Sequence, residues 1–118
     1  MSSDKQLRDV QDYLQRCKQL VNAGKWHLEP RNFPTITALG LTLDDVSGYL
    51  LTLKPHDYCK TEADHDSRRP GDIWFFLFDE PGSVLDYYVK LKLHPQLIHL
   101  SVISFHPPEA HIRRRFKP

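Results

Sequence analysis

The chain has 118 residues, of which 40% are hydrophobic and 26% are charged, and its net charge is +1. This length fits one domain with one core, and no apolar run approaches the ~20 residues that a membrane-spanning helix needs. Because the first residues also lack the apolar stretch of a signal peptide, we expect a soluble protein of the cytoplasm with no membrane partner.

The first segment, near residues 3–23, has the spacing of an amphipathic helix. Ser3 and Gln6 fit a capping box at its start, and Gly24 supplies a stop at its end. Its apolar stripe consists of Leu7, Val10, Tyr13, Leu14, Cys17, Leu20 and Val21. Cys17 and the second cysteine, Cys59, lack CxxC spacing, so we expect free or buried thiols rather than a disulfide or a zinc site.

The next segment contains Pro30 and Pro34, which forbid long regular structure; it allows a short strand at 26–28 and a turn of helix near 35–39. A second helix is then predicted near 43–53. Thr42 serves as its N-cap, and Asp45 follows three residues later.

After Pro55 the pattern changes to strands, which we predict near 57–66, 72–79, 84–93 and 97–106. The apolar run Ile73–Phe78 suits a strand covered on both faces. The third of these strands alternates strictly, so one side of it is apolar and the other is predicted to be solvated. The solvated side carries Asp86, Tyr88, Lys90 and Lys92.

Helices followed by a meander of strands predict an α+β fold, with an antiparallel sheet packed on two or three helices. We expect a single domain over 1–109 and a basic, flexible tail over 110–118. The tail residues Arg113, Arg114, Arg115 and Lys117 carry four positive charges, which leaves a net charge of −3 for residues 1–112. Any nucleic-acid site in the body must therefore be a local basic patch.

Several short motifs occur in a characteristic order. They include Asp57-Tyr58-Cys59-Lys60, Ile73-Trp74, Tyr88-Val89-Lys90 and Ser104-Phe105. In their order and spacing, over residues 18–106, the chain resembles the MqsR family, the motility quorum-sensing regulator toxins of bacterial toxin–antitoxin pairs. The resemblance implies a RelE-like microbial ribonuclease fold and metal-free cleavage of messenger RNA (mRNA) at GCU-type sequences, without a cofactor. It also implies inhibition by an antitoxin that binds DNA, expected to be a helix-turn-helix protein.

The resemblance also implies site residues. The family's lysine in the first motif falls on Lys60, and its tyrosine in Tyr-x-Lys falls on Tyr88. The chain departs from the family at three positions: His106 replaces a lysine, Phe75 replaces a polar residue, and Cys59 replaces a tyrosine.

The chemistry of these residues supports the same interpretation. Metal-free RNA cleavage uses the ribose 2′-OH as nucleophile, so a protein must accept its proton, stabilise the phosphorane and protonate the leaving 5′-oxygen. We expect ammonium charge near Tyr88 to lower its pKa and bring it into proton transfer. An imidazole, which titrates near neutral pH, makes His106 a candidate acid or base. The candidate catalytic residues are therefore Lys60, Tyr88 and His106, and the candidate RNA-binding residues are Lys90, Lys92, Arg113, Arg114 and Arg115.

Each assignment has a structural alternative. Tyr88 and Lys90 could be solvated strand residues, His106 could simply end a strand, and Lys60 could protect an exposed edge. The run Asp64-His65-Asp66 is not expected to bind a metal, because alternate strand residues point to opposite faces. The aromatic side chains of 74–78 are expected in the core. Two functions therefore remain: an mRNA-cleaving toxin, or a non-enzymatic interaction module that binds a protein or RNA.

Overall fold

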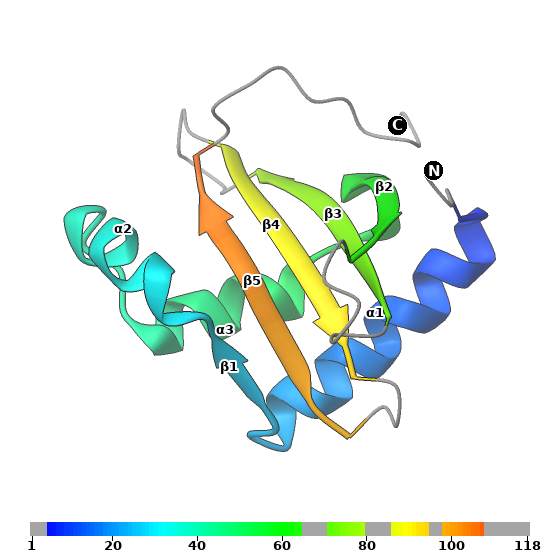
Figure 1. Cartoon of the computed structure of the whole chain (residues 1–118), viewed down its shortest axis with the longest axis horizontal. Coiled ribbons are helices and arrows are strands. Elements are labelled where there is room, and N and C mark those ends of the chain that lie inside the picture. Colours follow the sequence, from blue (N-terminus) through cyan, green and yellow to red (C-terminus); the bar gives the residue numbers. More distant parts are fainter. Residues whose placement is uncertain (1–4, 65–70, 80–85, 95–97, 108–118) are drawn as a thin grey trace.

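The computed structural model describes residues 5–64, 71–79, 86–94 and 98–107, and its elements follow the predicted order of helices before strands (Figure 1). The helices are α1 (Leu7–Asn22), α2 (Phe33–Ala38) and α3 (Leu43–Thr52), with short 3-10 turns η1 (Pro30–Asn32) and η2 (Pro55–Asp57). The strands are β1 (Trp26–Leu28), β2 (Tyr58–Ala63), β3 (Asp72–Asp79), β4 (Asp86–Leu93) and β5 (Leu100–His106).

The five strands form one sheet in the order β1-β5-β4-β3-β2. Strands β2 to β5 form the predicted antiparallel meander, but β1 pairs with β5 in parallel, so the sheet is mixed. The α+β class and the packing of the sheet on helices are confirmed. The parallel pair arises because β1 follows α1 in the chain and returns beside the last strand, a pairing between distant segments that periodicity does not reveal.

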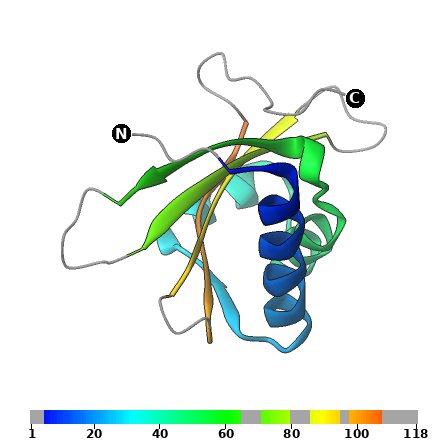
Figure 2. The same ribbon diagram turned by 90° about the vertical axis from the view of Figure 1, so that its right-hand side faces the viewer.

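The helices cover one face of the sheet, which we call the helix face (Figure 2). Buried side chains of α1, α2 and α3 form one core with the inward side chains of the strands. The opposite face, which we call the open face, has no described helix over it (Figure 2). It carries a smaller apolar cluster around Cys59, Phe75 and Leu77. Burial of β3 on both faces is thereby confirmed.

The helix ends show which local signals were informative. In α3, Asp45 N donates to Thr42 Oγ1 at 3.2 Å and Thr42 N donates to Asp45 Oδ2 at 2.8 Å, which confirms the predicted cap. Gly24, with φ +72°, ends α1 as predicted.

The predicted capping box placed Gln6 inside the first turn of α1, and this is wrong. Gln6 is itself the N-cap and has an extended backbone. The preceding Lys5 N donates to Tyr58 Oη at 3.0 Å, so this contact with β2 holds the chain outside the helix. Ser3 lies outside the described residues.

Both cysteines are buried and neither forms a disulfide. Cys17 faces the main core and Cys59 faces the smaller cluster, on opposite sides of the sheet. Among the described helices, none is long and apolar enough to cross a membrane.

Candidate functional site

Two neighbouring rows of residues cross the open face of the sheet. In one row Lys60 of β2 pairs with Phe75 of β3, Phe75 pairs with Lys90 of β4, and Lys90 pairs with Ser104 of β5. In the next row Leu77 pairs with Tyr88 and Tyr88 pairs with His106. Since paired residues on one face of a sheet are neighbours, the pairing brings together Lys60, Tyr88, Lys90 and His106 from three strands.

Lys60 reaches this face because β2 contains a bulge. Tyr58 pairs with Phe76, and Lys60 pairs with the very next residue of β3, Phe75, so Cys59 is an extra residue in β2. Tyr58 lies in the core on the helix face. Plain alternation would send Lys60 to the same side as Tyr58, two residues earlier. The bulge instead turns Lys60 toward the open face.

A second bulge does the same for His106. Lys90 pairs with Ser104 but Leu91 pairs with Val102, so Ile103 is an extra residue in β5. Val102 is buried in the core, and alternation alone would put Ser104 and His106 on its side. Because of the bulge, Phe105 enters the core and His106 pairs beside Tyr88 on the open face.

Asn32 of η1 holds the second bulge in place. Its Nδ2 donates to the carbonyl oxygens of Glu29 and Ile103, each at 3.0 Å, and its Oδ1 accepts from Phe105 N at 3.1 Å. The Asn32 side chain is buried, and it satisfies two backbone groups of β5 that lie beyond Val102, the last residue that β1 pairs with. Arg31 Nε also donates to Ile103 O, at 3.1 Å, from an exposed position.

Phe75 forms the centre of the open-face cluster. Phe75 is 5% exposed, and the ammonium groups of Lys60 and Lys90 lie 4.8 and 5.2 Å from the centroid of its ring. Both distances are within the range of cation–π attraction. Lys60 Nζ also forms an ion pair with Glu62 Oε1 at 2.9 Å. The predicted core position of Phe75 is confirmed, with the addition that two cations lie against its ring.

Tyr88 does not have the acidic phenol that we expected. Burial, reinforced by Cys59 and Glu62, raises the pKa of Tyr88 to about 12. The expected lowering by ammonium charge is therefore wrong, although Lys90 Nζ lies 5.6 Å from the Tyr88 ring centroid. Burial beside Phe75 and the carboxylate of Glu62 outweigh that charge, so Tyr88 carries its proton at neutral pH.

His106 lies at the end of β5, with its ring edge-on to Tyr88 at a centroid distance of 5.6 Å. Its Nδ1 lies 2.7 Å from the carbonyl oxygen of Pro107. A carbonyl oxygen only accepts, so Nδ1 carries the hydrogen and the neutral ring presents an unprotonated Nε2. This tautomer suits a proton acceptor.

Lys92 is buried, so the expectation that it is solvated like Lys90 is wrong. Its side chain is 7% exposed, and Nζ forms an ion pair with Asp64 Oδ2 at 2.8 Å. Gly71, with φ +116°, lies so close to Lys92 Cε that a Cβ there would come within 3.3 Å of it. Lys92 therefore links β4 to the end of β2 and packs against the residue before β3.

Other predicted residues lie outside the described part of the chain. These are Arg113, Arg114 and Arg115, together with His65 and Asp66. Within the described ranges no group of three or more His, Cys, Asp and Glu side chains is placed to hold a metal ion.

Glu62 is a site residue that the motifs did not predict. It lies two residues after Lys60 on β2, it pairs with the Lys60 ammonium, and it contributes to the raised pKa of Tyr88. The spacing of two residues on a predicted strand was a sufficient signal, because such residues share a face.

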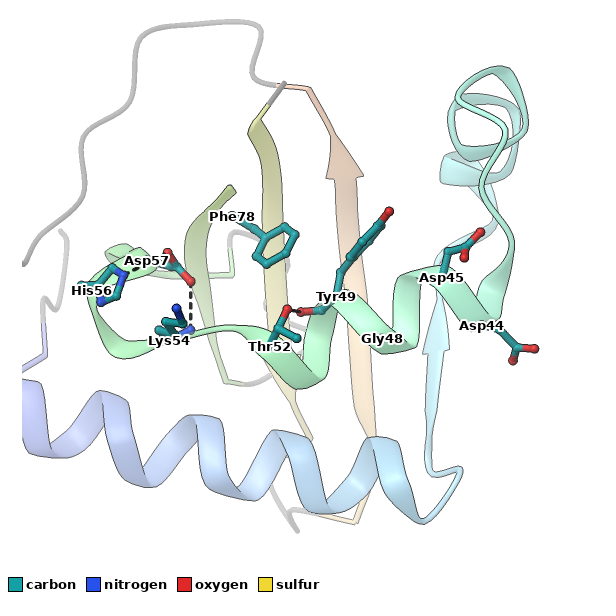
Figure 3. Close-up of a pocket in the computed structure, with 9 residues that line it drawn as sticks. All are labelled: Asp44, Asp45, Gly48, Tyr49, Thr52, Lys54, His56, Asp57 and Phe78. Carbon is teal, nitrogen blue, oxygen red and sulfur yellow. Dashed lines mark hydrogen bonds and ion pairs between the residues drawn. The ribbon is translucent and has the colours of Figure 1, made fainter. Parts of the chain in front are cut away.

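A pocket of about 450 Å³ lies away from these residues, between α3, η2 and β3 (Figure 3). Figure 3 shows Tyr49 and Phe78 at its centre, with His56 and Asp57 on one side and Asp45 on the other. Asp45 already caps α3, and Asp57 Oδ2 accepts from Lys54 N at 2.9 Å. The pocket does not include Lys60, Tyr88 or His106.

Comparison with known proteins supports the resemblance that the order of motifs indicated. No curated protein gives a match to this sequence. The family model described as motility quorum-sensing regulator, toxin of MqsA, matches residues 11–107, which include all of the described strands and most of α1. The chain therefore belongs to the MqsR family, whose members are the toxins of toxin–antitoxin pairs with an MqsA antitoxin.

Proposed function

We propose that this toxin is an endoribonuclease that cleaves mRNA on the open face of its sheet, without a metal ion. The observation that carries the proposal is the convergence of Lys60, Tyr88, Lys90 and His106 in two neighbouring rows, with two bulges turning Lys60 and His106 to that face. A bulge that re-aims a side chain is common beside active sites.

In this proposal His106 is the general base. Its Nδ1 is held by the Pro107 carbonyl, so Nε2 accepts the proton of the ribose 2′-OH. The 2′-oxygen then attacks the adjacent phosphorus, and the P–O5′ bond breaks to leave a 2′,3′-cyclic phosphate. The family's lysine at this position would carry charge instead, which makes His106 the main chemical difference of this chain.

Lys60 and Lys90 supply positive charge to the phosphorane, and an ammonium group also protonates the leaving 5′-oxygen. Tyr88 stays protonated, so its role is to donate a hydrogen bond to a phosphate oxygen rather than to accept a proton. Glu62 holds Lys60 in the row through their ion pair. Lys92 and the tail arginines remain candidates for RNA contact, although Lys92 would first have to leave Asp64.

The finer family features belong to the same proposal. We propose a preference for GCU-type sequences, action in the cytoplasm, and inhibition by a cognate antitoxin with a helix-turn-helix DNA-binding domain. The family membership supports each of these. The departures at His106, Phe75 and Cys59 bear most directly on the cleaved sequence, because they lie on or beside the proposed RNA site.

The test is cleavage of a labelled mRNA in EDTA by the purified chain and by Lys60→Ala. We expect products ending in 2′,3′-cyclic phosphate and a loss of about 10²–10³ in rate for the variant, the usual cost of removing one charge-stabilising donor. Lys54→Ala is the matched control, because Lys54 lies in the separate pocket and should leave the rate unchanged. Equal rates for the parent and Lys60→Ala would remove Lys60 from the site, and a requirement for divalent metal would contradict the mechanism.

Two observations favour the alternative of a binding module without cleavage. The Lys60 ammonium is already paired with Glu62, and Tyr88 holds its proton, so two of the candidate groups are less reactive than the sequence suggested. RNA binding with no products in the same assay would support this alternative.

A further inference from the structure

A group of histidines lies at the other end of β5 from His106, where β1 pairs with it. His27 Nδ1 lies 2.6 Å from His99 Nε2, and the two ring centroids are 4.9 Å apart. His94 approaches the same ring edge-on, at a centroid distance of 5.6 Å. This group is separate from the residues of the open face discussed above and from the pocket beside α3.

Backbone pairing fixes the separation of His27 and His99. His27 pairs with Ser101 in the parallel ladder, and Leu100 N donates to Lys25 O at 3.0 Å. His99 directly precedes Leu100, so the two rings extend from adjacent and mutually anchored backbones. The His27 side chain is 43% exposed, which gives solvent access to the pair.

A carboxylate lies on the far side of His27. Glu29 Oε1 lies 3.6 Å from His27 Nε2. A carboxylate at this nitrogen favours the tautomer with its hydrogen on Nε2, which leaves the lone pair of Nδ1 directed at His99. A carboxylate behind a histidine is the usual arrangement around metal-binding imidazoles, because it sets the tautomer and makes the ligand more basic.

We propose that His27 Nδ1 and His99 Nε2 form a two-imidazole binding site for a borderline divalent transition cation such as Zn²⁺ or Ni²⁺. Imidazole nitrogens suit these ions, with metal–nitrogen distances of ~2.0–2.1 Å. Two such bonds at a tetrahedral angle separate the nitrogens by about 3.3 Å. The rings must therefore move apart by less than an ångström, which rotation of two solvent-accessible side chains provides. The hydrogen that His99 Nε2 donates to His27 Nδ1 must also move, through solvent, to His99 Nδ1, so that Nε2 has a lone pair for the cation.

The site supplies two protein ligands from the described residues, and the other positions on the cation are open to water. His94 is not one of the ligands, since its Nε2 lies 3.1 Å from Ser101 Oγ and is engaged there. A bound cation would connect the three-residue edge strand β1 to β5 by a second link besides the backbone ladder. It would thereby stabilise the fold at the end remote from Lys60 and His106.

The test is calorimetric titration of the full chain with Zn²⁺. We expect His27→Ala and His99→Ala each to weaken binding by at least about tenfold, and Glu29→Gln by about tenfold, as removal of an orienting carboxylate does elsewhere. His56→Ala is the matched control: it removes another exposed histidine, in η2, and should bind like the parent. A parent that does not bind Zn²⁺, or alanine variants that bind like the parent, would overturn the proposal.

A thermal melt distinguishes a variant that has lost the Zn²⁺ site from one that has lost its fold. With Zn²⁺ at about 100 times its dissociation constant, the melting temperature of the parent should rise by several degrees and return on adding a chelator. The double variant His27→Ala/His99→Ala should fold and melt without any response to Zn²⁺. A response equal to that of the parent would contradict the proposal, whatever the result of the cleavage assay.

Discussion

The two faces of the sheet are built by different rules. On the helix face, apolar side chains at alternate positions of β3 and β4 pack against the helices, and the run Trp74, Phe76, Phe78 follows simple alternation. On the open face, Lys60 and His106 are in place only because β2 and β5 each contain an extra residue. The core therefore follows the alternating pattern of the sequence, while the candidate site depends on two local breaks in that pattern.

The largest expected effect tests the helix face. Phe76 is fully buried, and Phe76→Ala should cost about 3–5 kcal/mol of unfolding free energy through lost burial and the cavity left behind. Urea unfolding followed by circular dichroism measures it. The contrasting variant is Lys60→Ala on the open face, which should change stability by less than about 1 kcal/mol because exposed ion pairs contribute little. Similar losses for both variants would show that the two faces do not differ in this way.

Changes at His106 test the open face through its chemistry. As a general base it should contribute about 10²–10⁴ to the rate, so His106→Ala should cleave slowly while keeping the parent's stability. A base must be unprotonated to act, so the parent rate should fall in acid. His106→Lys should cleave about as slowly as His106→Ala, because a lysine ammonium carries its proton at neutral pH and cannot accept another. Rates measured across pH decide it. If His106→Ala cleaves at the parent rate with the same profile, His106 only ends β5.

Asn32 tests the second bulge directly, because its side chain binds the β5 backbone on both sides of Ser104. Asn32→Ala leaves Phe105 N–H and the carbonyl of Ile103 without this partner and should cost about 1–3 kcal/mol. Cleavage by the folded variant should also fall, since His106 would no longer be aimed at Tyr88. Arg31→Ala removes a second, exposed donor to the same carbonyl and should cost under about 1 kcal/mol. Equal effects of the two variants on stability and cleavage would show that Asn32 does not control the bulge.

These cases show which features could be read from the sequence. The Thr42 cap and the alternation of β4 are local patterns, so α3 and the open-face positions of Tyr88 and Lys90 were predictable. Strand β5 begins at Leu100 rather than near 97, and β1 pairs with it in parallel, because distant contacts decide both. Neither bulge has a glycine or other local signal, and Asn32 acts across more than 70 residues of chain. The assignments of the site residues and of the 110–118 tail remain predictions.

The smallest expected effect concerns the proton of Tyr88. Its pKa is raised to about 12, against about 10 for an exposed tyrosine in the unfolded chain, so folding favours the protonated phenol. That contribution to stability is fully present below about pH 10 and is lost as the pH rises from about 10 toward 12. Tyr88→Phe has no such proton, so its stability should fall less than the parent's between pH 9 and pH 11, as measured by urea unfolding at about these values. Tyr13, whose pKa burial also raises, titrates in both proteins and cancels in the comparison.

At neutral pH the Tyr88→Phe variant should cleave only a few-fold more slowly than the parent, because it loses one neutral hydrogen-bond donor and no base. Two outcomes would contradict these expectations. If the parent and Tyr88→Phe lose equal stability in alkali, folding does not raise the pKa of Tyr88. If the cleavage rate rises steeply above about pH 8 for the parent but not for Tyr88→Phe, Tyr88 acts as a proton acceptor.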